Sequence, residues 1–193
     1  SGLTRIEVSA AVQKRGKSGR WSAGAVKPAQ KLIEHSATRR EDLVALDLIS
    51  IAENASANRF TAFAEAAAAL RGHPRVEHGE TKERIQVRRT PPTVSLEPLE
   101  GGHKLTIRVD DYEVLNYGSD ARLVAYDGDE TLHVADVTDK LGAFIRATES
   151  FPALLPPAAR ARVLSLLPRL QPDAGLVIPT ELRGIECDAL ETL

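Results

Sequence analysis

Five short segments in which apolar and polar residues alternate lie between residues 84 and 136, and they limit the possible folds of this chain more than any other feature. A period of two is typical of strands that bury one face. The five segments are 84–89, 93–97, 104–109, 122–126 and 131–136. Gly101-Gly102 and Asp127-Gly128-Asp129 supply turn residues between neighbouring segments and predict two hairpins. The simplest topology for these strands is an antiparallel β-meander.

Two helices are predicted before this run of strands. Thr38-x-x-Glu41 matches a capping box, so the first helix should begin at Thr38 and end near residue 54. The apolar residues expected to face the core are Val44, Leu48 and Ile51, with Leu43 and Leu46 beside them. A second helix over residues 58–71 would complete a helical hairpin.

Two more helices are predicted after the strands. Thr138 can cap a helix that carries Leu141, Phe144 and Ile145 on one face. Pro156-Pro157 precedes another helix over residues 158–167. The order of helices, then strands, then helices predicts the α+β class.

We expect this architecture to divide into two parts. Residues 1–75 would hold a basic β-hairpin and the helical hairpin, and residues 76–193 the antiparallel sheet with its C-terminal helices. A single continuous domain is the alternative, because 193 residues suit either one core or a closely joined pair.

The composition is that of an ordinary globular protein, with 42% hydrophobic and 27% charged residues. No stretch approaches the roughly 18–20 consecutive apolar residues that a membrane span requires. Cys187 is the only cysteine, so neither an internal disulfide nor a cysteine-based zinc site is expected. We therefore expect a cytoplasmic protein with no membrane partner.

Positive charge is concentrated at the beginning of the chain. Residues 1–40 contain nine Lys or Arg and two acids, a local net charge of +7 in a chain whose total is −2. A hairpin is predicted within this region, because a strand-like segment up to residue 12 is followed by a tip with two glycines. Four cations and the only tryptophan lie at this tip: Lys14, Arg15, Lys17, Arg20 and Trp21.

This tip is the first candidate nucleic-acid site. Its cations can contact phosphates while Trp21 stacks on a base. Arg88 and Arg89, in the first predicted strand, are further candidates for DNA contact. The alternative is a charged, solvent-exposed hairpin with Trp21 in the core.

Negative charge is concentrated between residues 110 and 139, where nine acids accompany a single base, Arg122. A basic protein partner would be attracted to this region, and Asp127, Asp129 and Glu130 are its candidate partner-binding residues. The alternative is that these residues only form a tight turn.

The chain carries no recognisable catalytic motif. Gly16-Lys17-Ser18 resembles the end of a phosphate-binding loop, but Ala11 occupies the position where that loop needs its first glycine. His73 and His78 flank a proline in a loop and lack the spacing of a zinc pair. We therefore predict a protein that is not an enzyme and has no metal and no cofactor of its own.

Several short apolar segments occur in a familiar order. They are His73-Pro74-Arg75-Val76, the run 85–97, Gly101-Gly102-His103-Lys104-Leu105, Leu123-Val124-Ala125-Tyr126-Asp127-Gly128 and Val177-Ile178-Pro179-Thr180-Glu181-Leu182-Arg183-Gly184. This order resembles the N-terminal accessory region that precedes the motor in bacterial SNF2-family helicases of the DEAD/DEAH type.

The resemblance implies that the chain is a fragment of a longer protein. SNF2-type motors couple ATP hydrolysis to movement on duplex DNA, and their ATP and Mg²⁺ sites belong to the motor lobes, so no catalytic residue is expected here. The chain would dock on its own motor domain, on another protein or on DNA, and so regulate the motor. A stand-alone protein-interaction module without a nucleic-acid role is the alternative.

Overall fold

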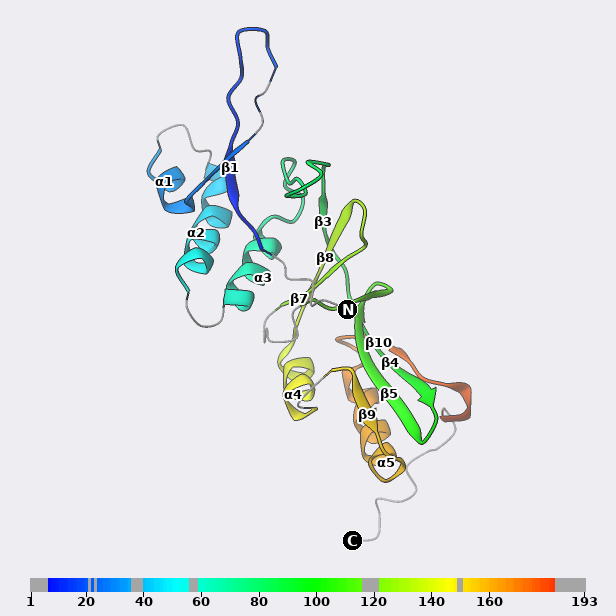
Figure 1. Ribbon diagram of the computed structural model, residues 1–193. Helices are drawn as coiled ribbons and strands as arrows, with labels where there is room; N and C mark the ends of the chain where they lie inside the picture. Colours follow the sequence, from blue (N-terminus) through cyan, green and yellow to red (C-terminus); the bar gives the residue numbers. More distant parts are fainter. Residues whose placement is uncertain are drawn as a thin grey trace.

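The computed structural model describes residues 7–20, 22, 24–35, 40–55, 59–115, 122–148 and 151–182, apart from the side chains of Glu41, Arg59, Phe60 and Glu181. The molecule is elongated, with a helical part and a projecting hairpin at one end and a larger sheet at the other (Figure 1). A small sheet lies between them. The expected cap Thr38, the expected helix start Asn58 and the residues Trp21 and Cys187 lie outside the described residues.

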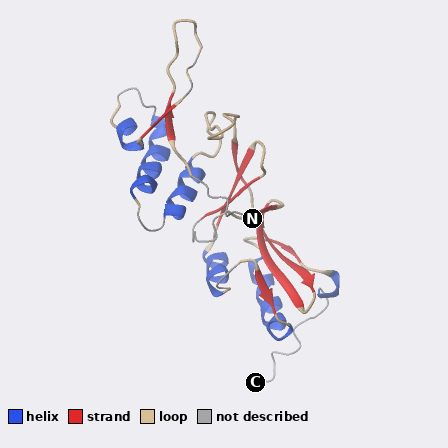
Figure 2. Ribbon diagram, viewed as in Figure 1, coloured by secondary structure: helices blue, strands red, loops and turns tan. Residues whose placement is uncertain are grey.

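The projecting hairpin, here called the finger, comprises residues 10–27. Its base is a two-stranded antiparallel ladder of β1 (Ala10–Val12) and β2 (Ala25–Lys27). Beyond this ladder the finger continues as a long loop (Figure 2). Gly19 adopts a φ of +80°, which a glycine takes without steric cost, so the chain can reverse at the tip. The predicted N-terminal hairpin is therefore present.

Three helices pack beside the base of the finger: α1 (Ala29–Ile33), α2 (Arg40–Asn54) and α3 (Arg59–Ala69). The helical hairpin of α2 and α3 was predicted, whereas α1 was not. The core of this part contains small residues, Ala29 of α1 and Ala66 of α3, around Leu46 and Ile49 of α2. Small side chains allow the three helices to approach closely.

The side of α2 that faces the core agrees only in part with the predicted one. Val44 and Ile51 are 64% and 53% exposed, so the prediction is wrong for these two residues. Leu46, which was expected beside them, is 7% exposed, and the half-buried Leu48 packs against the core cluster. The apolar residues of α2 lie on more than one side of the helix, and packing against α1 and α3 buries the side that carries Leu46 and Ile49.

The small sheet has three strands in the order β3-β8-β7: β3 (Gln86–Arg89), β7 (Arg122–Tyr126) and β8 (Thr131–Asp136). It is buried on both faces. Val124 and Val134 pack against α3 in one cluster, whereas Leu123, Ala125 and Ala135 point into the core on the other side. The small sheet therefore joins the helical part to the remainder of the chain through continuous packing.

The large sheet contains five strands: β4 (Pro92–Leu99), β5 (Gly102–Val109), β6 (Tyr112–Glu113), β9 (Ala153–Leu155) and β10 (Gly175–Val177). β4 and β5 pair antiparallel along their whole length, and β6 and β9 both pair with the other edge of β5. The inner face carries Leu96, Leu105 and Ile107, each at most 2% exposed. This face forms the largest core cluster.

The C-terminal helices cover this core. They are α4 (Asp139–Ala147) and α5 (Pro157–Leu166), with two 3₁₀ helices at Leu167–Leu170 and Thr180–Leu182. As predicted, the Thr138 hydroxyl accepts a hydrogen bond from the Leu141 N–H at 3.3 Å, and Pro157 occupies the first turn of α5. The α-helix α5 ends at Leu166, and Pro168 lies within the 3₁₀ helix that follows it.

The predicted α+β class and all five predicted strands are confirmed. The antiparallel hairpins at Gly101-Gly102 and Asp127-Gly128-Asp129 are also present. Two pairings, however, are parallel and belong to no meander: β3 with β8, and β10 with β4. Among the described helices, none is both long and apolar enough to cross a membrane.

Candidate nucleic-acid interface

The finger is held in shape by its own backbone. The Ser22 N–H donates to the Lys14 carbonyl at 2.8 Å, and the Gly16 N–H donates to the Arg20 carbonyl at 2.8 Å. The Ser22 hydroxyl accepts from the Lys14 N–H at 2.9 Å. These bonds continue the pairing of the two arms beyond β1 and β2, so the tip is a defined turn at the end of a hairpin.

All four predicted cations of the tip, Lys14, Arg15, Lys17 and Arg20, are exposed. Arg15 Nε donates to the Gly19 carbonyl at 3.2 Å, which holds that guanidinium against the turn. Across the described ranges of the chain, none of these four cations forms an ion pair. The finger therefore presents positive charge that no neighbouring carboxylate neutralises.

Arginines in the body of the molecule behave differently. Five of them contact carboxylates within 4 Å: Arg71, Arg75, Arg89, Arg108 and Arg122. Three of the five converge on one acid, Asp136 of β8. Carboxylates of the protein thus partly neutralise these five arginines, whereas among the described residues none does so for the four cations of the tip.

A hollow of about 450 Å³ lies at the base of the finger. Its cations are Lys14 and Lys27 from the two arms of the hairpin and Lys31 from α1, and all three are exposed. Its apolar lining is formed by Val12, Ala25 and Leu32, and Ser22 and His35 complete it. None of the described residues that line this hollow is a carboxylate. We call it the basic hollow.

Helix α1 places Lys31 beside the finger. The chain turns at Pro28, whose φ of −53° and ψ of 130° end the extended arm, and α1 begins at the next residue. The Ala29 N–H donates to Glu53 Oε2 of α2 at 3.0 Å, so this carboxylate occupies the N-terminal end of α1. Sequence analysis missed Lys27 and Lys31 as site residues because it predicted no helix after Pro28.

The finger is also tied to the loop that precedes β3. Gln13 Nε2 donates to Glu77 Oε1 at 3.2 Å, and residue 77 forms a β-bridge with Arg84. The base of the finger thus contacts a segment more than sixty residues later in the sequence. This contact positions the finger relative to the small sheet.

Arg88 and Arg89 lie on β3 and not on the finger. Arg88 donates to Gln86 Oε1 through Nε at 3.1 Å and Nη2 at 2.6 Å. Arg89 Nε contacts Asp136 Oδ2 at 2.8 Å, although its side chain is 72% exposed. Both arginines therefore have partners in the protein, and the structure does not group them with the cations of the tip.

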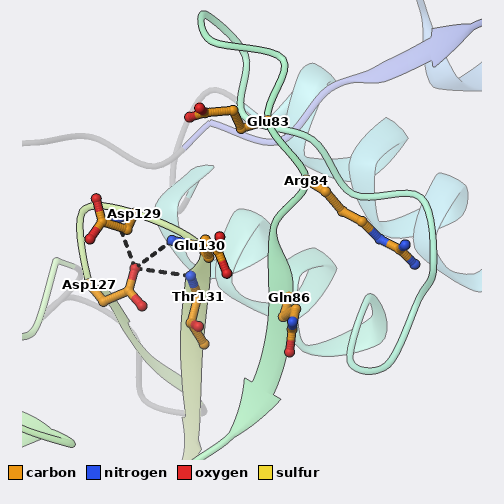
Figure 3. A pocket seen from close by; sticks show the side chains of 7 residues that line it. All are labelled: Glu83, Arg84, Gln86, Asp127, Asp129, Glu130 and Thr131. Atoms are coloured by element: carbon orange, nitrogen blue, oxygen red, sulfur yellow. Dashed lines mark hydrogen bonds between the residues drawn. The ribbon is translucent and has the colours of Figure 1, made fainter.

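The acidic candidates form the turn between β7 and β8. One Asp127 oxygen, Oδ1, accepts backbone N–H bonds from Asp129, Glu130 and Thr131 at 2.9, 3.0 and 2.9 Å (Figure 3). Burial of the Asp127 carboxyl raises its pKa, but the hydrogen bonds from these three donors lower the pKa by a larger amount. The pKa therefore lies below its ordinary value of 3.8. Asp127 thus stabilises the turn, whereas Asp129 and Glu130 are exposed.

A second hollow, of about 690 Å³, adjoins this turn. Glu83, Asp129 and Glu130 contribute carboxylates to it, and the Arg84 side chain extends away from the Asp127 turn (Figure 3). Tyr126 closes the turn, because its hydroxyl donates to the Asp129 carbonyl at 2.8 Å. The structure thus brings together all three acidic residues that the sequence predicted, in a surface of opposite charge to the finger.

The two candidate zinc ligands are not brought together. His73 Nε2 lies 2.8 Å from Asp42 Oδ1, and Arg75 Nη2 lies 2.8 Å from Asp42 Oδ2. His78 instead stacks on Tyr126, with 5.9 Å between the ring centroids. Within the ranges that the structure describes, no three His, Cys, Asp or Glu side chains are grouped so that they could hold a metal ion.

The contacts of His73 and Arg75 fasten α2 to the segment after α3. Burial raises the pKa of the Asp42 carboxyl, but the hydrogen bonds and charges of His73 and Arg75 lower it below the ordinary value of 3.8. The role of His73 is therefore a structural contact with Asp42. This contact could not be predicted from local sequence, because the two residues lie on different elements.

Comparison with known proteins adds no assignment. No protein-family model, no curated protein and no solved structure matches this chain. The function must therefore be argued from the arrangement of its own residues.

Proposed function

We propose that this chain is a non-catalytic accessory domain that contacts nucleic acid through the finger and the basic hollow. The observation that carries the proposal is the state of the cations at the tip: Lys14, Arg15, Lys17 and Arg20 are exposed on a projecting hairpin and unneutralised by carboxylates within the described structure. Such cations bind phosphates and release counterions.

The distribution of charge supports contact at this end of the molecule only. The turn at Asp129 and Glu130 belongs to the small sheet, and its exposed carboxylates repel a polyanion. The overall charge of −2 likewise favours a weak, localised contact over a surface that binds nucleic acid everywhere. We therefore expect an accessory contact that depends strongly on salt.

The order of the short apolar segments between residues 73 and 184 supports a place beside a motor. We propose that the longer protein is a cytoplasmic SNF2-like, ATP-dependent helicase or translocase, with ATP and Mg²⁺ bound by its motor lobes. The domain described here would dock on the motor or on another protein and guide nucleic acid to it through the finger.

The test is a binding titration of the purified chain. Fluorescently labelled duplex and single-stranded DNA are titrated at 50 and 200 mM salt, and four phosphate contacts predict a fall in affinity of about 50- to 150-fold between these conditions. The triple variant with Lys14→Glu, Lys17→Glu and Arg20→Glu should lose this binding.

A matched variant controls for the change in net charge. Lys140→Glu, Arg162→Glu and Arg169→Glu reverse three exposed cations of the C-terminal region and should leave the affinity within about twofold, since α4 and α5 lie at the end of the molecule opposite the finger (Figure 1). Equal loss in the two triple variants, or binding by the finger variant at the wild-type level, would overturn the proposal.

A second candidate function is supported by the second hollow, which adjoins the turn between β7 and β8. Glu83, Asp129 and Glu130 line a surface depression of about 690 Å³ that suits a basic segment of a protein partner. In this alternative the chain is a protein-interaction module with no nucleic-acid role. Asp129→Lys with Glu130→Lys should then weaken binding of polylysine, used as a basic polypeptide probe, to the immobilised chain, while the finger variant binds it at least as well as the wild type.

A further inference from the structure

The basic hollow combines two kinds of surface. Lys14, Lys27 and Lys31 supply positive charge, whereas Val12, Ala25 and Leu32 supply apolar surface between them. A site for a phosphate alone needs only the cations. The apolar residues indicate a ligand that presents an uncharged face next to its negative charge.

Duplex DNA does not present such a face. Its bases are stacked inside the helix, and its outer surface is sugar and phosphate, with base edges accessible only in the grooves. A single strand exposes the faces of its bases beside its phosphates. The hollow, of about 450 Å³, is a surface depression, and its exposed lysines remain accessible to a strand that passes over it.

We propose that the basic hollow holds one unstacked nucleotide of a single-stranded nucleic acid, with its base or sugar against Val12, Ala25 and Leu32 and its flanking phosphates beside Lys27 and Lys31. This inference rests on the proposed nucleic-acid function and names the form of nucleic acid that the site takes. Lys14 belongs to both surfaces, so it links the hollow to the cations of the tip.

The finger extends the basic surface beyond the hollow. Lys14 lines the hollow, and Arg15, Lys17 and Arg20 lie farther along the hairpin and are exposed. A strand held in the hollow can therefore contact these cations with the phosphates on one side of the bound nucleotide.

A free nucleotide fits the same hollow less well than a strand does. It would use the three lysines of the hollow, Lys14 among them, but not Arg15, Lys17 and Arg20, which lie farther along the hairpin. Thymidine monophosphate should therefore compete with an oligonucleotide only at far higher concentration.

The experiment compares four probes on the whole chain at 50 mM salt. They are an oligothymidylate of twelve nucleotides, an oligouridylate RNA of the same length, a DNA duplex of the same length, and an abasic DNA strand with as many phosphates as the oligothymidylate. The single strands with bases should bind at least about fivefold tighter than the abasic strand, because base contacts add to the phosphate contacts.

Two variants separate the hollow from the finger. Lys27→Glu with Lys31→Glu should weaken single-strand binding at least about tenfold and abolish the advantage of strands with bases over the abasic strand. The control, Lys140→Glu with Arg162→Glu, should retain both the affinity and that advantage. Circular dichroism confirms that each variant is folded before binding is measured.

The outcomes distinguish this inference from the proposed function. If the duplex and the abasic strand bind as tightly as oligothymidylate, the finger binds nucleic acid but the inference about the hollow is wrong. If thymidine monophosphate competes as well as the oligonucleotide, the occupant is a free nucleotide and the inference is also wrong. If no probe binds, the proposed function itself fails.

Discussion

Gly102 is the position at which one added methyl group should disturb the large sheet most directly. A Cβ built on Gly102 would lie 2.4 Å from the Leu155 carbonyl oxygen of β9. Ordinary contacts of a Cβ begin at 3.4 Å, so β9 must move by about 1 Å to accept alanine. Because the clashing atom belongs to the backbone, no side-chain rotation can relieve the contact.

The cost of Gly102→Ala follows from what β9 carries. Leu155 is 8% exposed and belongs to the largest core cluster, so moving β9 disturbs a packed interior. Forcing one extra methyl group into such a position lowers the free energy of unfolding by about 1–3 kcal/mol. We expect a lower urea midpoint with an unchanged slope, measured by circular dichroism.

Gly79→Ala is the matched control for this substitution. A Cβ at Gly79 meets no atom within 4 Å, and its φ lies outside the left-handed region. Its free energy of unfolding should stay within about 0.5 kcal/mol of the wild-type value. If Gly102→Ala proves as stable as Gly79→Ala, β9 does not lie against β5 as described, and the reasoning is refuted.

Three further predictions concern stability. Asp127→Ala removes the acceptor of three backbone N–H groups and should lower the free energy of unfolding by about 1–2 kcal/mol. Asp129→Ala should change the free energy of unfolding by less than about 0.5 kcal/mol. Urea titrations that give the two variants the same stability would contradict this prediction. The carboxyls of Asp42 and Asp127 have lowered pKa values, so the unfolded state takes up protons first as the pH falls. Their stabilisation should be complete above about pH 5 and decline below about pH 4. Asp42→Asn should therefore make urea midpoints measured below about pH 4 less dependent on pH. Ile49→Ala should lower the free energy of unfolding by about 2–4 kcal/mol, and Ile51→Ala, at an exposed position, by less than about 1 kcal/mol. If thermal unfolding shows Ile51→Ala to be the more destabilising substitution, the original prediction for α2 is correct.

Local signals in the sequence predicted the elements well. The Asp-Gly-Asp turn at residues 127–129 needs a residue with positive φ, and Gly128 adopts +90° there. The cap at Thr138 likewise depends only on residues within one turn of helix. These features could be predicted because the interactions that create them join neighbours in the chain.

Pairings between distant strands could not be predicted in this way. β3 pairs with β8 in parallel, although β4, β5, β6 and β7 lie between them in the sequence. The alternation of apolar residues shows which residues of a strand share a face, but it is the same for a parallel and for an antiparallel neighbour. The mixed topology is therefore decided by packing in the folded state.

The site was predicted in part for the same reason. The cations of the tip are neighbours in the sequence and form a visible cluster, so the finger could be identified as a candidate. The basic hollow depends on α1, a helix of five residues that turns Lys31 toward the arms of the hairpin. Such a short helix has no periodicity to detect, and its position depends on contacts with α2.

The parallel pairing of β10 with β4 has a consequence for synthesis on the ribosome. The register joins Thr93 to Gly175, so this edge of β4 stays unpaired until β10 leaves the exit tunnel, which happens much later than for β5. Until then the nascent polypeptide displays an open strand edge, which invites pairing with other chains. A stop codon just before Gly175 would leave residues 93–95 of β4 permanently unpaired and should yield a product that aggregates more than the full chain, in which β10 pairs with them.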